Sequence, residues 1–88
     1  MKTNFLKSFT RDLKKVKNQA VRAALREAIE NVETVDDLGG INNLKKLSGA
    51  GDYYRIRVRD YRIGIAVAGD TVNFVRCLPR RDMYRFFP

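Results

Sequence analysis

Alternating arginines in the middle of the chain are the residues best suited to chemistry on a phosphate. Arg55, Arg57 and Arg59 occupy every second position, and Arg62 follows shortly after them. Every second side chain of a β-strand points to the same face, so these arginines are expected to lie together. A guanidinium group offers a rigid fork of N–H donors that matches phosphate oxygens. The spacing therefore predicts an anion-binding face.

The segment that carries these arginines, residues 53–67, is typical of a β-hairpin. A two-residue turn at Asp60-Tyr61 would put the arginines on one face and apolar side chains on the other. Gly64 and Ala66 would form a floor of small residues under the arginines, which leaves space for an anion. The expected cross-strand pairs are Arg59 with Arg62, Arg57 with Gly64, Arg55 with Ala66, Val58 with Ile63, Ile56 with Ile65, and Tyr54 with Val67.

The chain of 88 residues carries a formal net charge of +8, which indicates an anionic partner. All lysines lie at or before Lys46, whereas eight of the eleven arginines lie at or after Arg55. Arginine is the better residue for bidentate phosphate contact, so we expect the C-terminal half to contact phosphate. The alternative is an arginine face that is merely solvated. The length predicts a single domain over residues 1–88.

The chain contains no histidine and a single cysteine, Cys77. This composition excludes a Cys/His metal site, a Ser-His-Asp triad and the usual histidine acid–base pair of a ribonuclease. We therefore expect no metal and no cofactor. Cys77 is expected to be a small core residue rather than a reactive thiol. No apolar run approaches membrane-spanning length and the N-terminus lacks a secretory signal, so we expect a cytoplasmic protein without membrane contact.

Two helices are predicted before the hairpin. Apolar residues three and four positions apart indicate an amphipathic helix from Leu6 to Val16. Asn18 can cap a second helix, and the short connection suggests an antiparallel helical hairpin. The buried stripe of the second helix is expected to comprise Val21, Ala24, Leu25, Ala28, Ile29 and Val32.

Strands are predicted on either side of these elements. Residues 2–5 favour a short edge strand, and residues 71–78 favour a third strand of the meander that Pro79 ends. That strand is apolar on both sides and is therefore expected to be central. Val72 and Phe74 would lie on one face, and Val75 and Cys77 on the other. The predicted fold is a small α+β domain, with an N-terminal strand and a two-helix hairpin packed on an antiparallel sheet.

Three stretches carry a resemblance to a known family. They are KKLSG at residues 45–49, YYRIRVRDYRI at residues 53–63 and VRCLPRRDMYR at residues 75–85. In this order and spacing the chain resembles the RelE/ParE toxins of bacterial toxin–antitoxin modules, over nearly its whole length. The resemblance implies a RelE-like fold of the microbial ribonuclease-like type.

The resemblance is to the RelE branch, which cleaves messenger RNA in the ribosomal A site. It implies a ribosome-dependent endoribonuclease in which a 2′-hydroxyl attacks the adjacent phosphodiester, driven by positioning and electrostatic stabilisation. The implied partners are mRNA in the A site, ribosomal RNA and a cognate acidic antitoxin. Two alternatives stay open: a DNA gyrase inhibitor like the ParE branch, and a catalytically weak module that binds nucleic acid or antitoxin.

The resemblance also implies which residues form the site. The expected catalytic residues are Arg57 on the first arm of the hairpin, Arg62 on the second, Arg80 after the last strand and Tyr84 in the tail. The arginines would stabilise the phosphate, and Tyr84 would stack on a base or orient the attacking hydroxyl. Pro79 stands where the family commonly has a histidine. The expected substrate-binding residues are Arg55, Arg59, Arg76 and Arg81.

Some of these residues have more than one interpretation. Arg59 lies at the turn, where it could be an ordinary surface residue or contact ribosomal RNA. Arg76 could lie beside Phe74 as a snorkelling side chain or point toward the phosphate. Asp82 could accept a proton or pair with a neighbouring arginine. Arginine itself stays protonated, so it is a stabiliser and a poor base.

Overall fold

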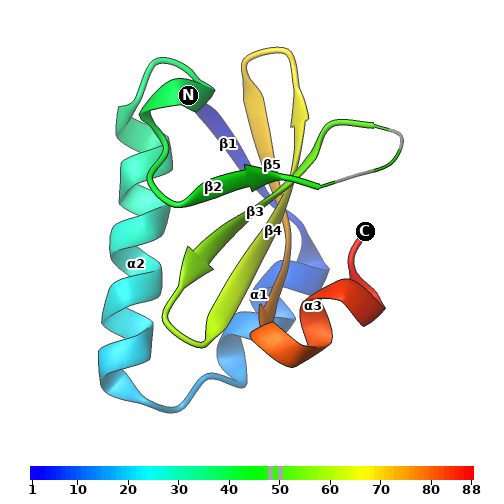
Figure 1. Cartoon of the computed structure of the whole chain (residues 1–88). Coiled ribbons are helices and arrows are strands. Elements are labelled where there is room, and N and C mark those ends of the chain that lie inside the picture. Colours follow the sequence, from blue (N-terminus) through cyan, green and yellow to red (C-terminus); the bar gives the residue numbers. More distant parts are fainter. Residues whose placement is uncertain (48, 50) are drawn as a thin grey trace.

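The computed structural model describes residues 1–47, 49 and 51–88, which form one sheet with helices beside it (Figure 1). Ser48 of the KKLSG stretch and Ala50 lie outside the described residues. Within them, no helix has both the length and the apolar character needed to cross a membrane. In chain order the elements are β1 (Lys2–Phe5), α1 (Lys7–Lys14), α2 (Gln19–Thr34), the 3-10 helix η1 (Leu38–Gly40), β2 (Leu44–Lys46), β3 (Tyr53–Val58), β4 (Tyr61–Ala68), β5 (Thr71–Pro79) and α3 (Arg80–Phe86).

The five strands of the described chain form one mixed sheet in the order β1-β5-β4-β3-β2. β1 runs parallel to β5, and the other neighbours are antiparallel. The predicted α+β class and the β3-β4-β5 meander are confirmed, and β5 is central because it lies between β1 and β4. The sequence did not predict the short strand β2 or the helix α3, which was expected only as a basic tail.

The hairpin of β3 and β4 turns one residue earlier than predicted. Arg59 and Asp60 form the turn, with Arg59 in the left-handed region at a φ of 53°. Tyr61 joins the strand instead, as aromatic residues prefer. The predicted register is therefore wrong by two positions, but the faces are unchanged because the side-chain period of a strand is also two. The observed pairs are Val58 with Tyr61, Arg57 with Arg62, Ile56 with Ile63, Arg55 with Gly64, Tyr54 with Ile65 and Tyr53 with Ala66.

The helices α1 and α2 cover the apolar face of the sheet, as predicted (Figure 1). α1 packs mainly against β5, and α2 against β3. The Asn18 side chain caps α2 by accepting a hydrogen bond from the Val21 N–H at 3.1 Å, which confirms the predicted cap. The buried core between helices and sheet comprises Phe9, Val16, Leu25, Val32, Ile41, Ile56, Val58, Ile63, Ile65, Val72, Phe74 and Cys77.

A β-bulge interrupts the pairing of β4 with β5. Gly64 pairs with Arg76 and Ile65 with Phe74, so Val75 is an extra residue on β5. The extra residue resets the alternation of β5. Phe74 and Cys77 both reach the helix-covered core, whereas Val75 packs on the side of α3. The prediction that Val75 and Cys77 share a face is therefore wrong.

Cys77 is a core residue, as predicted, with 2% of its surface exposed. Burial raises the pKa of its thiol to about 12, and the charge of Asp12 adds to the effect. Because the folded chain holds the proton that an unfolded chain releases above about pH 8.5, this thiol makes the fold less stable as pH rises from there toward 12.

We expect the folded chain to resist thiol labelling at Cys77. A disulfide reagent at pH 8 should label the chain rapidly in concentrated urea but only as fast as it unfolds in buffer, because the reactive thiolate is scarce and the side chain is buried. The measurement is the labelling rate at increasing reagent concentration. A native rate that keeps rising in proportion to reagent would contradict this prediction.

Candidate functional site

The arginine face of the sheet brings together residues from three elements. Burial lowers the pKa of Arg62 on β4, and the positive charges of Arg55, Arg80 and Arg57 lower it further. The Tyr84 hydroxyl acts in the opposite direction. Arg57 pairs with Arg62 across the hairpin, and Arg55 pairs with Gly64 two positions further along β4. β3, β4 and α3 thus place three further guanidinium groups and one phenol around Arg62. All of them were predicted from the sequence as site residues.

Arg62 is more deeply buried than an arginine whose whole side chain is free to bind phosphate. Only 8% of its surface is exposed. Its Nη1 donates hydrogen bonds to the carbonyl oxygens of Arg59 and Tyr61, both at 2.8 Å. One nitrogen of the guanidinium thus holds the β3–β4 turn, so this arginine positions the turn as well as contributing charge.

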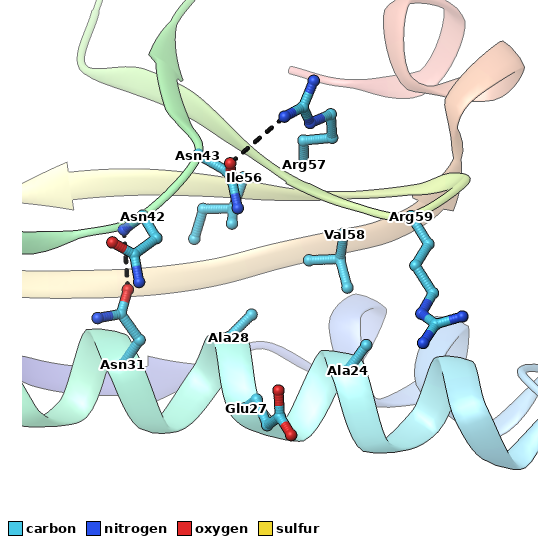
Figure 2. A pocket seen from close by; sticks show the side chains of 10 residues that line it. All are labelled: Ala24, Glu27, Ala28, Asn31, Asn42, Asn43, Ile56, Arg57, Val58 and Arg59. Carbon is cyan, nitrogen blue, oxygen red and sulfur yellow. Dashed lines mark hydrogen bonds between the residues drawn. The ribbon is translucent and has the colours of Figure 1, made fainter.

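Asn43 holds the two arginines of β3 and was not singled out in the sequence. Its carbonyl oxygen accepts hydrogen bonds from the Arg57 N–H at 3.2 Å and from Arg55 Nη1 at 2.9 Å. Its side-chain oxygen accepts from Arg57 Nη2 at 3.5 Å, the bond drawn in Figure 2. Asn43 has a φ of 61°, a conformation that asparagine adopts more readily than most residues. The Asn42-Asn43 pair was the only sequence signal for it.

Two substitutions separate the backbone role of Asn43 from its side-chain role. We expect Asn43→Ala to lower the free energy of unfolding by about 1 kcal/mol, because alanine is strained in the left-handed region. Asn43→Gly removes the same side-chain hydrogen bond without that strain and should cost less. Urea unfolding of the two variants compares them directly. An equal loss of stability in both would contradict a backbone role.

The arginines gathered around Arg62 make no ion pair among the described residues. Within the described part of the chain the ion pairs are Lys2–Asp70 at 3.8 Å and Arg76–Asp12 at 2.7 Å, and neither involves the arginines gathered around Arg62. Asn43 offers them only neutral oxygens. Like charges that lie close together without counterions favour an anionic ligand. The described part of the chain contains no cluster of His, Cys, Asp or Glu residues that could hold a metal ion.

Arg76 lies apart from this group. Beyond Phe74, β5 has no β1 partner, and α1 closes the free edge instead. Ser8 Oγ donates to the Val75 carbonyl oxygen at 2.6 Å, and Asp12 Oδ2 accepts from the Cys77 N–H at 3.0 Å. The Asp12 carboxylate also accepts from Arg76 Nε at 2.7 Å and Nη2 at 3.2 Å. The Arg76 guanidinium binds the Asp12 carboxylate. This differs from both positions predicted for Arg76, which were a contact with substrate and a place beside Phe74.

Arg59 also points away from the group. Figure 2 shows its side chain directed toward α2, whereas Arg57 points away from α2. Both line a hollow of about 380 Å³ between α2 and β3, together with Asn42 and Asn43. The turn redirects Arg59, because its left-handed backbone ends the alternation of the strand. The structure therefore separates Arg59 from the predicted arginine row.

The floor of small residues is not empty space. A Cβ added at Gly64 would lie 2.8 Å from the ring of Phe87, which is only 4% exposed. The Tyr53 ring meets Phe87 edge-on, with centroids 5.6 Å apart. Gly64 is thus needed for close packing of the C-terminal tail. The prediction that this floor leaves room for an anion is wrong.

The open part of the site lies beside α3. A hollow of about 570 Å³ is lined by Asp60, Pro79, Arg80, Arg81 and Tyr84. The Arg80 N–H donates to the Asp60 carbonyl oxygen at 2.7 Å, which fixes the start of α3 against the β3–β4 turn. Tyr84 is 67% exposed. The lining of this hollow combines two arginines and an exposed aromatic ring with one aspartate, Asp60.

Comparisons with known proteins agree on the family of this chain. Residues 4–84 match the family described as ParE toxin of type II toxin–antitoxin systems. The chain is 43% identical to Toxin RelE3 of Methanocaldococcus jannaschii over the full length of both. Its fold matches a RelB–RelE antitoxin–toxin complex from Methanococcus jannaschii with a TM-score of 0.79 and 41% identity, covering 97% of this chain and 99% of that one.

A more distant match extends the agreement in fold alone. The archaeal RelE–RelB complex from Pyrococcus horikoshii gives a TM-score of 0.71 at 23% identity, covering 90% of this chain and 93% of that one. The chain belongs to the RelE/ParE family of toxins of type II toxin–antitoxin modules.

Proposed function

We propose that this toxin is a ribosome-dependent endoribonuclease that stops translation by cutting mRNA in the ribosomal A site. The observation that carries the proposal is the group of Arg55, Arg57, Arg62 and Arg80 without carboxylate partners, beside the exposed Tyr84. Such a site suits a reaction in which a negatively charged phosphate gains further charge in the transition state. The match to Toxin RelE3 supports the RelE branch.

The proposed reaction is an in-line displacement at phosphorus. The 2′-oxygen of the RNA forms a bond to the adjacent phosphorus while the bond to the 5′-oxygen breaks. The products are a 2′,3′-cyclic phosphate and a 5′-hydroxyl, and the proton of the 2′-hydroxyl is balanced by the proton that the leaving oxygen gains. Arg80 and Arg57 stabilise the charge on the non-bridging oxygens. Tyr84 stacks on a base, which fixes the geometry of attack.

The proposed protein partner is an acidic antitoxin. Solved structures similar to this chain are complexes of RelE with RelB, among them the one that shares 41% identity. The uncompensated arginines would attract acidic side chains as readily as phosphate. An antitoxin that covers Tyr84 and Arg80 would block the same surface that RNA needs.

A gyrase inhibitor is the second candidate, because the family match is to a ParE toxin. The two functions predict different damage in cells. Expression of the chain should produce growth arrest with new RNA 5′ ends inside coding frames, mapped by sequencing of 5′-hydroxyl ends. Growth arrest with intact messages and loss of DNA supercoiling would instead support gyrase inhibition and overturn the endonuclease proposal.

Purified components test the ribosome dependence. We expect the chain to cleave mRNA on a programmed ribosome much faster than the same RNA free in solution, because the site has no histidine base of its own. Equal rates on free and ribosome-bound RNA would contradict ribosome dependence while leaving the nuclease activity intact. Binding without cleavage in both assays would favour the weak binding module.

A further inference from the structure

A second hollow adjoins the one that holds Arg80, and the two share the Tyr84 side chain. It measures about 410 Å³ and is lined by Lys45, Lys46, Leu47, Tyr84, Phe87 and Pro88. It lies between the edge strand β2 and the C-terminal tail. Tyr84 therefore stands between an arginine-lined hollow and a lysine-lined hollow.

The walls of this second hollow suit a nucleobase. Leu47 and Phe87 belong to the small apolar cluster that ties α3 to the sheet, and the Tyr84 ring is 67% exposed above them. No aspartate or glutamate side chain lines the hollow. Aromatic rings beside apolar walls bind the faces of bases without regard to sequence.

The charge at the mouth of the hollow suits a phosphate. Lys45 on β2 pairs with Arg55 on β3, so both lie on the arginine face. Lys45 is exposed, and neither ion pair of the described residues includes it. The positive surface of the site thus continues from Arg80 past Tyr84 to the edge of the sheet. A single-stranded nucleic acid could follow that line.

We propose that Lys45, Leu47 and Tyr84 form a subsite for the nucleotide next to the phosphate held by Arg80. The base lies in the hollow against Tyr84 and Leu47, and its phosphodiester contacts Lys45. This subsite rests on the proposed function, since it needs single-stranded RNA as the substrate. It gives the site a second anchoring point, which would hold the scissile phosphate in register.

The phosphate contact is tested by the salt dependence of binding. The probe is a fluorescein-labelled 2′-O-methyl RNA tetranucleotide, which lacks the attacking hydroxyl and so binds without being cut. Lys45→Ala should lower the slope of log affinity against log salt by about 0.7, the value for one contact to a single strand. The matched control, Lys14→Ala, removes the same charge from α1 on the helix-covered side and should leave the slope unchanged.

The base contact is tested with abasic versions of the same probe. Removing the base from one of the four nucleotides, the one that occupies the hollow, should weaken binding to the wild-type chain by about tenfold. That penalty should be largely lost in Leu47→Ala and in Tyr84→Ala, with urea unfolding used to confirm that both variants are folded. The proposal is overturned by equal slopes for Lys45→Ala and Lys14→Ala, by an unchanged base penalty in both variants, or by a wild-type chain that fails to bind at low salt.

The results of these binding experiments can be distinguished from a failure of the proposed endonuclease function. Cleavage in cells is read from RNA 5′ ends and does not depend on the affinity for a short oligonucleotide. New coding-frame ends together with equal salt slopes would retain the endonuclease and remove the subsite. Intact messages together with a reduced slope for Lys45→Ala would retain the subsite as a binding surface and remove the endonuclease.

Discussion

Replacing Arg80 by alanine is expected to slow cleavage of mRNA on a programmed ribosome by about 100- to 1000-fold, the usual cost of removing one donor to transition-state charge. Arg80 lines the open hollow with Tyr84, and its N–H is fixed to the Asp60 carbonyl oxygen. In the proposed mechanism its guanidinium would contact the phosphate from an anchored backbone. The measurement is the single-turnover rate at saturating toxin, which separates the chemical step from binding.

Two further variants define the cause of the loss. Arg85→Ala removes an equal charge from the same helix, where the Arg85 guanidinium lies 5.2 Å from the centre of the Phe86 ring. It should cleave at a rate close to wild type. Arg80→Lys keeps the charge but not the two-N–H fork, so it should recover part of the rate. Wild-type cleavage by Arg80→Ala would remove Arg80 from the proposed mechanism.

Replacing Asp12 by alanine is expected to cost about 3 kcal/mol of unfolding free energy, the lower end of the range for breaking a buried ion pair. Asp12 is 6% exposed and accepts hydrogen bonds from the Arg76 side chain and the Cys77 N–H. Its removal leaves a cation and an edge N–H of β5 without a partner. The lower end applies because 28% of the Arg76 side chain is exposed, so water can partly replace the carboxylate.

The control is an ion pair on the surface. Asp70 lies 3.8 Å from Lys2, and both side chains are more than two-thirds exposed, at 71% and 77%. Asp70→Ala should therefore cost between about 0 and 1 kcal/mol. Urea unfolding of both variants gives the comparison. Similar losses in the two would show that Asp12 has no special part in closing the edge of β5.

Local patterns predicted the elements whose signals are long or repeated. The second helix carries both a cap at Asn18 and an apolar stripe from Val21 to Val32, and it formed as expected. The central hairpin kept its predicted faces although its register was wrong, since a shift of two positions preserves the alternation. By contrast, β2 has three residues and α3 has seven. A strand of three residues and a helix of about two turns carry too little periodicity to be recognised.

The site residues also fall into those that the sequence predicted and those that only the tertiary structure revealed. The sequence alone determined that arginines would crowd one face of a hairpin, and the tail residues Arg80 and Tyr84 followed from the resemblance. Only the tertiary structure decided which arginines share the site, because Arg76 meets a carboxylate 64 positions away and Arg59 is redirected by its turn. Such choices depend on packing between distant segments, which no local pattern contains.

The packing of Phe87 against the arginine face shows most clearly what the sequence could not predict. Strand alternation placed Gly64 beneath the arginines, and the sequence offered no reason to expect a ring above it. Phe87 fills that space because α3 brings the tail back across the sheet. The sequence by itself determined the charge of the face and the side on which it lies. The tertiary structure decided where the face is open, since an opening is whatever the packed chain leaves uncovered.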